Sequence, residues 1–427
     1  MDKEGTMEQR IEILPGVFLT AVQTDKFKTG CFSINFLRPM CRAEASMNAL
    51  IPSVLLRASE RYPDIPSISA RLDELYGASM GTLVRKKGEV QLVGFFADFI
   101  EDALAGEPVF VPVLEFMAEI LLHPLTKNGH FVPEFVEGEK RNLSNAIAAR
   151  INDKRSYATS RLLQTMCREE AYGVPRLGEM EDVARVGAEG LYAHYKKVLA
   201  ESQAELFYMG RKTPHEAAEC LQRVLSALPR AQAFTPVGTA QGAAPAAPRE
   251  VREALDVTQG KLCIGLRTGC TVRDESYPAL LMLNAIYGGG VTSKLFQNVR
   301  EQMSLCYYAG SSIEKFKGVM VVSAGIEFDK YATAKDEILR QLELCRAGEI
   351  TDEEFEAARR YILSELKLAQ DSPGRLDDFY MGQVVAGLSG TMDELADSVL
   401  CVRKDDVAAA ARRLQLDTIY FLEGENT

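Results

Sequence analysis

Alternating apolar and polar residues predict a strand near the start of each half of this chain. Residues 32–36 read Phe-Ser-Ile-Asn-Phe and residues 262–266 read Leu-Cys-Ile-Gly-Leu, and a period of two is typical of a strand with one buried face. A loop and then a helix are expected after each strand, with the helices beginning near Ala49 and Ala279. The loops carry equivalent charged residues, namely Arg42 and Glu44 in the first half and Arg273 and Glu275 in the second.

The same correspondence continues along both halves. Residues 90–96 and 319–326 are mostly apolar and predict a second pair of strands, after which helices are expected. Each half then closes with a helix and a terminal strand. In the helices, Phe135 and Leu143 of the first half match Phe355 and Leu363 of the second. The closing helix is expected at residues 192–199 and 407–414, and the terminal strand at residues 206–210 and 419–424. Repetition on this scale predicts a duplicated α+β domain, each copy a largely antiparallel sheet with helices packed on one face.

An uncharged segment separates the two copies. Residues 231–248 are rich in Ala, Pro and Gly and contain no Asp, Glu, Lys or Arg, which is the composition of a linker. We therefore expect an N-terminal domain over residues 1–230 and a C-terminal domain over residues 249–427. A chain of 427 residues is long enough for two hydrophobic cores.

Composition narrows the class of protein. With 47% hydrophobic residues the chain is expected to be globular, and no apolar run of about 18 residues predicts a membrane span. No hydrophobic signal core follows Met1, and the nine cysteines are scattered without a Cys-x-x-Cys pair, so we expect reduced thiols and a cytoplasmic location. The formal charge of -11 argues against a nucleic-acid partner.

A run of three glycines, Gly288, Gly289 and Gly290, opens the candidate site. Glycine permits backbone angles closed to other residues and lets another chain approach closely. The run lacks the G-x-x-x-x-G-K-[ST] spacing of a phosphate-binding loop, so nucleotide binding is not expected. Two interpretations stay open, a plain tight turn before a helix or contact with a peptide substrate.

A helix and a strand are expected after the glycines. Thr292 or Ser293 can cap the helix, and Leu295 and Val299 share its buried face.

Arg300 and Tyr307 would then emerge at the end of the helix and in the following strand. A forked guanidinium and a phenol could together hold a peptide carbonyl. Taken singly, Arg300 would be a solvated helix residue and Tyr307 a core residue. Tyr308 would face the opposite side of the strand and pack in the core.

Residues 288–308 resemble the second-half signature of the insulinase/pitrilysin (inverzincin) metallopeptidase family. A glycine turn, S-x-L-F, R-E and L-x-Y follow one another in that signature at the spacing found here. The matching residues are Gly290, Ser293, Leu295, Phe296, Arg300, Glu301, Leu305 and Tyr307. The resemblance implies a processing-peptidase/LuxS-like metallohydrolase fold, in which Arg300, Tyr307 and the glycines contribute to substrate binding.

The zinc motif of that family, His-x-x-Glu-His, has no counterpart in this chain. The last residues of the segment 47–59 resemble the family's M-L-F-K-G-T sequence. This match aligns the segment with the helix that carries the zinc motif in the family. The ligand positions become Ala49 and Ser53, the general-base position becomes Pro52, and the distal ligand position becomes Ala146. Zinc needs three good N, O or S donors and an open position, so we expect neither a catalytic residue nor a bound metal. The histidines form no other zinc motif; they are His123, His130, His194 and His215.

The resemblance also implies a division of labour. Two-chain members of the family pair a subunit that keeps His-x-x-Glu-His with a subunit that has lost the ligands and contacts the substrate. This chain is similar to the second type and, through the Leu-Tyr-Gly-Ala segment at residues 75–78, to the bacterial YmfF-like members. Those are associated with a zinc-bearing partner and with modification of elongation factor P. The expected role is a non-catalytic subunit of a heterodimeric peptidase, with zinc only in the partner.

Two other roles stay open. The chain could be a proteolytically inactive peptide-binding or scaffold protein, which homodimerisation would favour. It could also be an autonomous hydrolase, which stoichiometric zinc in the purified chain would favour. Ser53 as a serine nucleophile is not expected, because no G-x-S-x-G elbow surrounds it.

Overall fold

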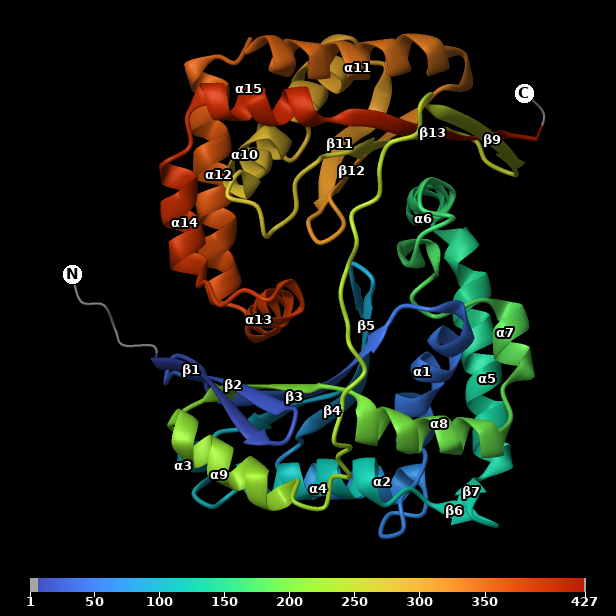
Figure 1. The fold of residues 1–427 in the computed structure, drawn as a ribbon, viewed down its shortest axis with the longest axis vertical. Coiled ribbons are helices and arrows are strands. Elements are labelled where there is room, and N and C mark those ends of the chain that lie inside the picture. Colours follow the sequence, from blue (N-terminus) through green and yellow to red (C-terminus); the bar gives the residue numbers. More distant parts are fainter. Residues whose placement is uncertain (1–6, 426–427) are drawn as a thin grey trace. The chain divides into compact units, whose positions relative to one another are not determined.

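The structure is a computed structural model that describes residues 7–425, and the chain divides into two compact units (Figure 1). Unit 1 comprises the described part of Met1–Ala148 together with Val174–Gly238 and Leu376–Val385. Unit 2 comprises Ala149–Gly173, Thr239–Arg375 and the described part of Ala386–Thr427. Each unit therefore consists mainly of one half of the sequence and takes one segment from the other half.

The sheet of unit 1 has six strands in the order β1-β2-β8-β3-β5-β4, and only the β2–β8 pair is parallel. Its strands are β1 (Met7–Leu14), β2 (Val17–Gln23), β3 (Thr29–Pro39), β4 (Ser79–Lys87), β5 (Val90–Ile100) and β8 (Ala204–Gly210). The alternation read from the sequence is present in β3. Phe32, Ile34 and Phe36 belong to the hydrophobic core. Ser33 lies on the other face of the sheet, where its hydroxyl donates a hydrogen bond to Asp377.

Most helices of unit 1 cover one face of this sheet, and Figure 1 shows α4, α8 and α9 on the same side of it. The helices are α1 (Arg42–Leu55), α2 (Ile65–Glu74), α3 (Asp102–Ala105), α4 (Phe110–Leu122), α5 (Pro133–Ala148), α7 (Met180–Arg185), α8 (Ala188–Glu201) and α9 (Pro214–Val224). Two short strands, β6 (Thr126–Lys127) and β7 (His130–Phe131), form a hairpin. The loop predicted around Arg42 and Glu44 is wrong, because α1 already begins at Arg42. Glu44 lies in its first turn, where the helix dipole favours a carboxylate.

The sheet of unit 2 has five strands in the order β11-β12-β10-β13-β9, and only the β13–β9 pair is parallel. Its strands are β9 (Arg249–Leu255), β10 (Gly260–Arg267), β11 (Cys306–Glu314), β12 (Val319–Ile326) and β13 (Gln415–Gly424). This order matches β4-β5-β3-β8-β2 of unit 1 strand for strand, including the place of the parallel pair. The duplicated α+β domain predicted from the sequence is therefore confirmed, and β1 is an addition to the first copy.

The helices of unit 2 again lie mainly on one face of the sheet. They are η1 (Ala149–Asn152), α6 (Lys154–Met166), η2 (Ala171–Gly173), α10 (Tyr277–Tyr287), η3 (Leu295–Gln302), η4 (Phe328–Lys330), α11 (Tyr331–Ala347), α12 (Asp352–Gln370), α14 (Met392–Leu400) and α15 (Lys404–Arg413). One more helix, α13 (Pro373–Ala386), begins in unit 2 and continues into unit 1. Among the described residues, none of these or the earlier helices has the length and apolar character to cross a membrane.

Each sheet carries, on its second face, a helix that belongs to the other half of the sequence. In unit 2 the apolar residues Ala158, Leu162 and Met166 of α6 pack on Cys263 of β10 and Tyr420 of β13. The neighbouring residues of β10 point into the opposite core, so α6 lies on the far side of that sheet.

In unit 1 the reciprocal segment comes from α13. The Ser33 hydroxyl of β3 donates a 2.8 Å hydrogen bond to Asp377, and Arg85 of β4 lies 2.5 Å from the same carboxylate. The ring of Tyr380 stacks on Phe207 of β8 with 5.9 Å between centroids. Helices α6 and α13 follow α5 and α12, the two long helices matched in the sequence, so the two copies exchange equivalent helices.

Candidate functional site

Gly288 and Gly289 are required by the close packing of their own backbone. The Ser311 amide of β11 donates a 2.8 Å hydrogen bond to the Gly288 carbonyl, and a Cβ on Gly288 would lie 2.5 Å from that nitrogen. A Cβ on Gly289 would lie 3.0 Å from the carbonyl oxygen of Asn284 and from Cα of Ala285. A tight turn therefore accounts for both glycines.

Gly290 has no comparable packing constraint. The nearest atoms to a Cβ there would belong to Tyr361 at 3.9 Å, which is an ordinary van der Waals distance, and its φ is not positive. The following residue, Val291, is 67% exposed. Packing therefore does not account for glycine at position 290, and contact of the three glycines with a ligand stays a prediction.

The helix after the glycines is wound as a π-helix rather than an α-helix. Within η3 and its end, the Met303 amide donates to the Asn298 carbonyl, five residues earlier, at 3.0 Å. Leu295 and Val299 are fully buried, as the sequence predicts. π-Helices are rare and occur often at functional sites. The apolar pattern of the sequence carried no signal for this winding.

Buried polar contacts attach η3 to its neighbours within unit 2. Lys294, only 6% exposed, lies 2.7 Å from Glu354 of α12. The Asn298 side-chain amide donates to Gln341 of α11 at 2.8 Å, and Gln341 donates to Glu337 at 2.6 Å. These supporting residues were missed in the sequence, where single polar residues in a helix give no indication of their partners. Together they fix the position of the helix that carries Arg300.

Arg300 lies in the last turn of η3, where its guanidinium faces the ring of Phe296 at 4.5 Å from the centroid. Its side chain is 39% exposed, and its ion pair with the adjacent Glu301 is long, at 3.5 Å. Exposed cation–π contacts and surface ion pairs contribute little energy. The guanidinium is thus oriented by the ring while its charge stays available to a ligand.

Tyr307 occupies a β-bulge on the edge strand β11. Cys306 pairs with Ile326 and Tyr308 pairs with Gly325, so Tyr307 is the additional residue between them. A bulge re-aims a side chain relative to the regular alternation of a strand. Tyr307 is 64% exposed, which makes the interpretation as a core residue wrong.

The charge of Arg300 is felt at the start of the strand that carries Tyr307. Burial raises the pKa of Cys306 to about 11, and the nearby positive charge of Arg300 opposes that rise. One local segment therefore presents an oriented guanidinium and an exposed phenol. Both can donate hydrogen bonds, which are the groups needed to bind a peptide carbonyl.

Tyr308 does not pack in the hydrophobic core as predicted. It is half-buried, and the guanidinium of Arg155 of α6 lies 4.2 Å from its ring centroid. The ring occupies the space left by the missing side chain of Gly325, where a Cβ would lie 2.4 Å from the ring. Because its ring packs over Gly325, Tyr308 lies outside the hydrophobic core.

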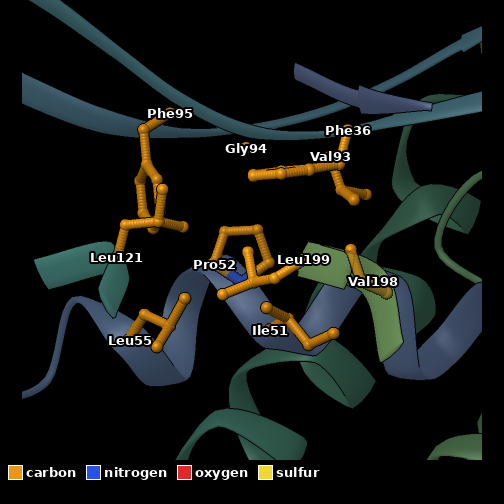
Figure 2. A pocket seen from close by; sticks show the side chains of 10 residues that line it. All are labelled: Phe36, Ile51, Pro52, Leu55, Val93, Gly94, Phe95, Leu121, Val198 and Leu199. Carbon is orange, nitrogen blue, oxygen red and sulfur yellow. The ribbon is translucent and has the colours of Figure 1, made fainter. Parts of the chain in front are cut away.

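The α1 positions matched to the zinc motif provide no set of metal ligands. Ala49 is 4% exposed and Pro52 is buried, while Ser53 is half-buried. Figure 2 shows Pro52, together with Ile51 and Leu55, facing the strands across a cavity of about 10 Å³ lined by apolar side chains and Gly94. Such a lining offers no polar partner for a metal ion or a water molecule.

The distal position, Ala146, lies exposed on α5. Helices α1 and α5 contact one another through Arg57 and Glu139, whose closest atoms are 3.4 Å apart. The methyl groups of Ala49 and Ala146 cannot coordinate a metal, and the hydroxyl of Ser53 alone does not supply the three donors that zinc needs, so the family's zinc does not fit the residues at these positions. Within residues 7–425, moreover, no group of three or more His, Cys, Asp or Glu side chains could hold a metal ion.

The histidine near α1 belongs to a buried structural network. His194 Nε2 lies 2.7 Å from Asn48 Oδ1, and the Asn48 amide donates to Gln91 at 2.9 Å. Burial lowers the pKa of His194 to about 4, so its ring is neutral near pH 7. Its role is to satisfy the polar groups of the core.

Comparison with known proteins agrees with this architecture. Residues 185–362 match the profile of the peptidase M16 inactive domain. The chain is 32% identical to the "probable inactive metalloprotease YmfF" of Bacillus subtilis over 411 residues, which cover 96% of each chain.

Solved structures show the same fold over nearly the whole chain. The crystal structure of a conserved protein from Enterococcus faecalis V583 is 30% identical, with a TM-score of 0.90 over 98% of this chain and 99% of that one. A protease from Helicobacter pylori superposes with a TM-score of 0.83 at 14% identity, over 98% of this chain and 99% of that one. The fold and the degenerate zinc helix define an M16-type metallopeptidase scaffold without its metal ligands. The chain belongs to the peptidase M16 family and is a homologue of its inactive members.

Proposed function

We propose that this chain is a non-catalytic subunit that binds an extended peptide through Arg300 and Tyr307 and positions it for a zinc-bearing M16 partner. One observation carries the proposal. An exposed guanidinium and an exposed phenol are held by a π-helix and a bulge with buried polar supports, while the zinc positions in α1 and α5 are Ala49, Ser53 and Ala146. The chain therefore has side chains that can bind a peptide, whereas the positions matched to the zinc ligands carry no ligand set.

The polar supports strengthen this proposal. Burying Lys294 against Glu354 gives little net stability by itself, because desolvation offsets most of the attraction. The Lys294–Glu354 pair is consistent with a requirement that the helix carrying Arg300 be held in a defined position. The nine cysteines are all free thiols, which supports a reducing compartment such as the cytoplasm.

The test is co-expression with a candidate zinc-bearing M16 chain, followed by size analysis and a peptide-cleavage assay of each chain alone and of the mixture. The proposal expects a stable heterodimer and cleavage only in the mixture. Elongation factor P is the first protein substrate to include in the assay. A homodimer that binds peptide without cleavage in any mixture would instead indicate a scaffold protein.

The residues of the site are tested in the same assay. The combined change Arg300→Ala and Tyr307→Phe is expected to reduce the joint cleavage rate at low peptide concentration by about thirtyfold, because each of the two removed hydrogen bonds to a ligand contributes about 1 kcal/mol. Arg141→Ala, an exposed arginine of α5, is the control for the lost charge. An unchanged rate in the double variant would contradict the proposed role of this site.

A further inference from the structure

Among the residues that the structure describes, two cations on the α6 side of the unit 2 sheet have no carboxylate partner. Arg155 of α6 and Lys261 of β10 lie at 4.2 Å and 5.9 Å from the ring centroid of Tyr308. Among the described residues, neither has a carboxylate oxygen within 4.0 Å. Lys261 is instead bonded to the side-chain carbonyl of Gln259.

Other cations beside α6 do have such partners. Arg161 lies 3.0 Å from Glu253, and Arg267 lies 2.6 Å from Glu170, which also pairs with Lys317 at 2.6 Å. The contrast matters in a chain with a formal charge of -11, where carboxylates are abundant. Among the described residues, the two cations beside Tyr308 therefore differ from Arg161, Arg267 and Lys317 in having no carboxylate within 4.0 Å.

Asp153, the acidic residue two positions before Arg155, is already engaged elsewhere. Asp153 accepts hydrogen bonds from the amides of Arg155 and Ser156, each at 3.1 Å, and from the Ser156 hydroxyl at 2.6 Å, so its oxygens cap α6. Burial and the charge of Arg155 both lower the pKa of Lys261. An anion placed between the two cations would relieve that repulsion.

Tyr308 contributes a donor beside the cations. Within the described chain its hydroxyl is buried and has no hydrogen-bond partner. Burial raises its pKa, so the hydroxyl keeps its proton. Arg155 is an exposed side chain that lies over the ring of Tyr308. Lys261 and Tyr308 are half-buried, so an anion bound there would be partly shielded from water.

We propose that Arg155, Lys261 and the hydroxyl of Tyr308 form a binding site for a carboxylate of the bound peptide, either an acidic side chain or the C-terminus. This inference rests on the proposed function, because its ligand is the peptide held by Arg300 and Tyr307. Tyr307 and Tyr308 are consecutive residues with Cα atoms about 3.8 Å apart. The Tyr307 contact and the anion site therefore start from adjacent positions of β11.

The first measurement uses labelled peptides in three versions and reads binding by fluorescence anisotropy at fixed ionic strength. One version has a Glu side chain and an amidated C-terminus, one has Gln and a C-terminal carboxylate, and one has Gln and an amide. The wild-type chain should bind one of the two acidic versions about tenfold more tightly than the neutral version, and that version identifies the carboxylate. The double variant Arg155→Gln and Lys261→Gln should bind all three versions equally. The control, Lys28→Gln and Arg141→Gln, loses the same charge at exposed positions and should keep the wild-type preference.

The second measurement does not depend on peptide binding. The rate of Lys261 acetylation by an acylating reagent is followed by mass spectrometry in the wild-type chain alone, with inorganic phosphate or with chloride at equal ionic strength. Phosphate should slow acetylation of Lys261 several-fold and leave exposed Lys28 unaffected. An equal rate for Lys261 in both salts, or a double variant that keeps the wild-type preference for acidic peptide, overturns the site. If no peptide binds the wild-type chain, the proposed function fails, and protection of Lys261 alone decides whether the anion site stands.

Discussion

The Ser311 amide donates its hydrogen bond to the Gly288 carbonyl at 2.8 Å, so the edge of β11 is closed at this point by the glycine turn itself. There is no space between the two backbones for a side chain. Gly288→Ala is therefore expected to destabilise the chain by about 1–3 kcal/mol, because the added methyl group forces the backbones apart. Urea unfolding measures this, and Gly290→Ala, which meets ordinary contact distances, should change stability by less than about 0.5 kcal/mol. Equal losses in both variants would contradict the packing argument.

Phe296 is expected to matter for ligand affinity more than for folding. Its ring orients the Arg300 guanidinium at 4.5 Å, and a cation–π contact at an exposed site is worth about 0.5–1 kcal/mol. Phe296→Leu should weaken peptide binding about two- to five-fold through a less ordered Arg300, while Phe296→Tyr should preserve it. Anisotropy titration of a bound peptide gives the result. Identical affinity in the leucine variant would show that the ring does not position the guanidinium.

His194 is expected to make the chain less stable in mild acid. Burial lowers its pKa to about 4 in the folded chain, whereas an unfolded histidine titrates near 6.5. The unfolded chain thus binds more protons, and the contribution of His194 to stability is complete above pH 6.5 and is lost as the pH falls towards 4. At pH 5 the loss should be about 2 kcal/mol. Urea unfolding at pH 7 and pH 5 tests this, and His194→Gln should remove most of the difference; a variant with the wild-type pH dependence would refute the assignment.

Metal removal is expected to leave the chain unchanged. A metal that binds only the folded state raises the melting temperature, and a chelator reverses the effect. Since Ala49, Ser53 and Ala146 do not form a zinc-binding set, neither zinc nor EDTA should shift the melting temperature of the isolated chain. Elemental analysis that found one zinc per chain would revive the possibility of an autonomous hydrolase.

Asp377 is expected to stabilise unit 1 although it belongs to the second half of the sequence. Asp377→Ala removes the partner of Arg85 and of the Ser33 hydroxyl, and breaking a buried ion pair costs about 3 kcal/mol. Hydrogen exchange should rise in β3 and β4 and stay unchanged in the unit 2 sheet. Asp336→Ala, at an exposed position of α11, is the control. If hydrogen exchange became faster only in unit 2, the claim that Asp377 stabilises unit 1 would be wrong.

Local patterns in the sequence accounted for the duplication and for most strands, because alternation in segments such as residues 32–36 depends only on neighbouring residues. They did not reveal the π-helix, since Leu295 and Val299 share a face in either winding. The bulge at Tyr307 depends on one additional residue opposite β12, which a single strand does not record. Partners such as Glu354 for Lys294 are set by the tertiary fold.

The exchange of α6 and α13 has a consequence for the origin of this chain. Two repeats that each lend an equivalent helix to the other have the connectivity of a domain-swapped dimer, in which neither protomer is complete without its twin. Joining the protomers by residues 231–248 would give the present polypeptide. In that case, a single ancestral copy had to form a homodimer before gene duplication joined two copies in one chain.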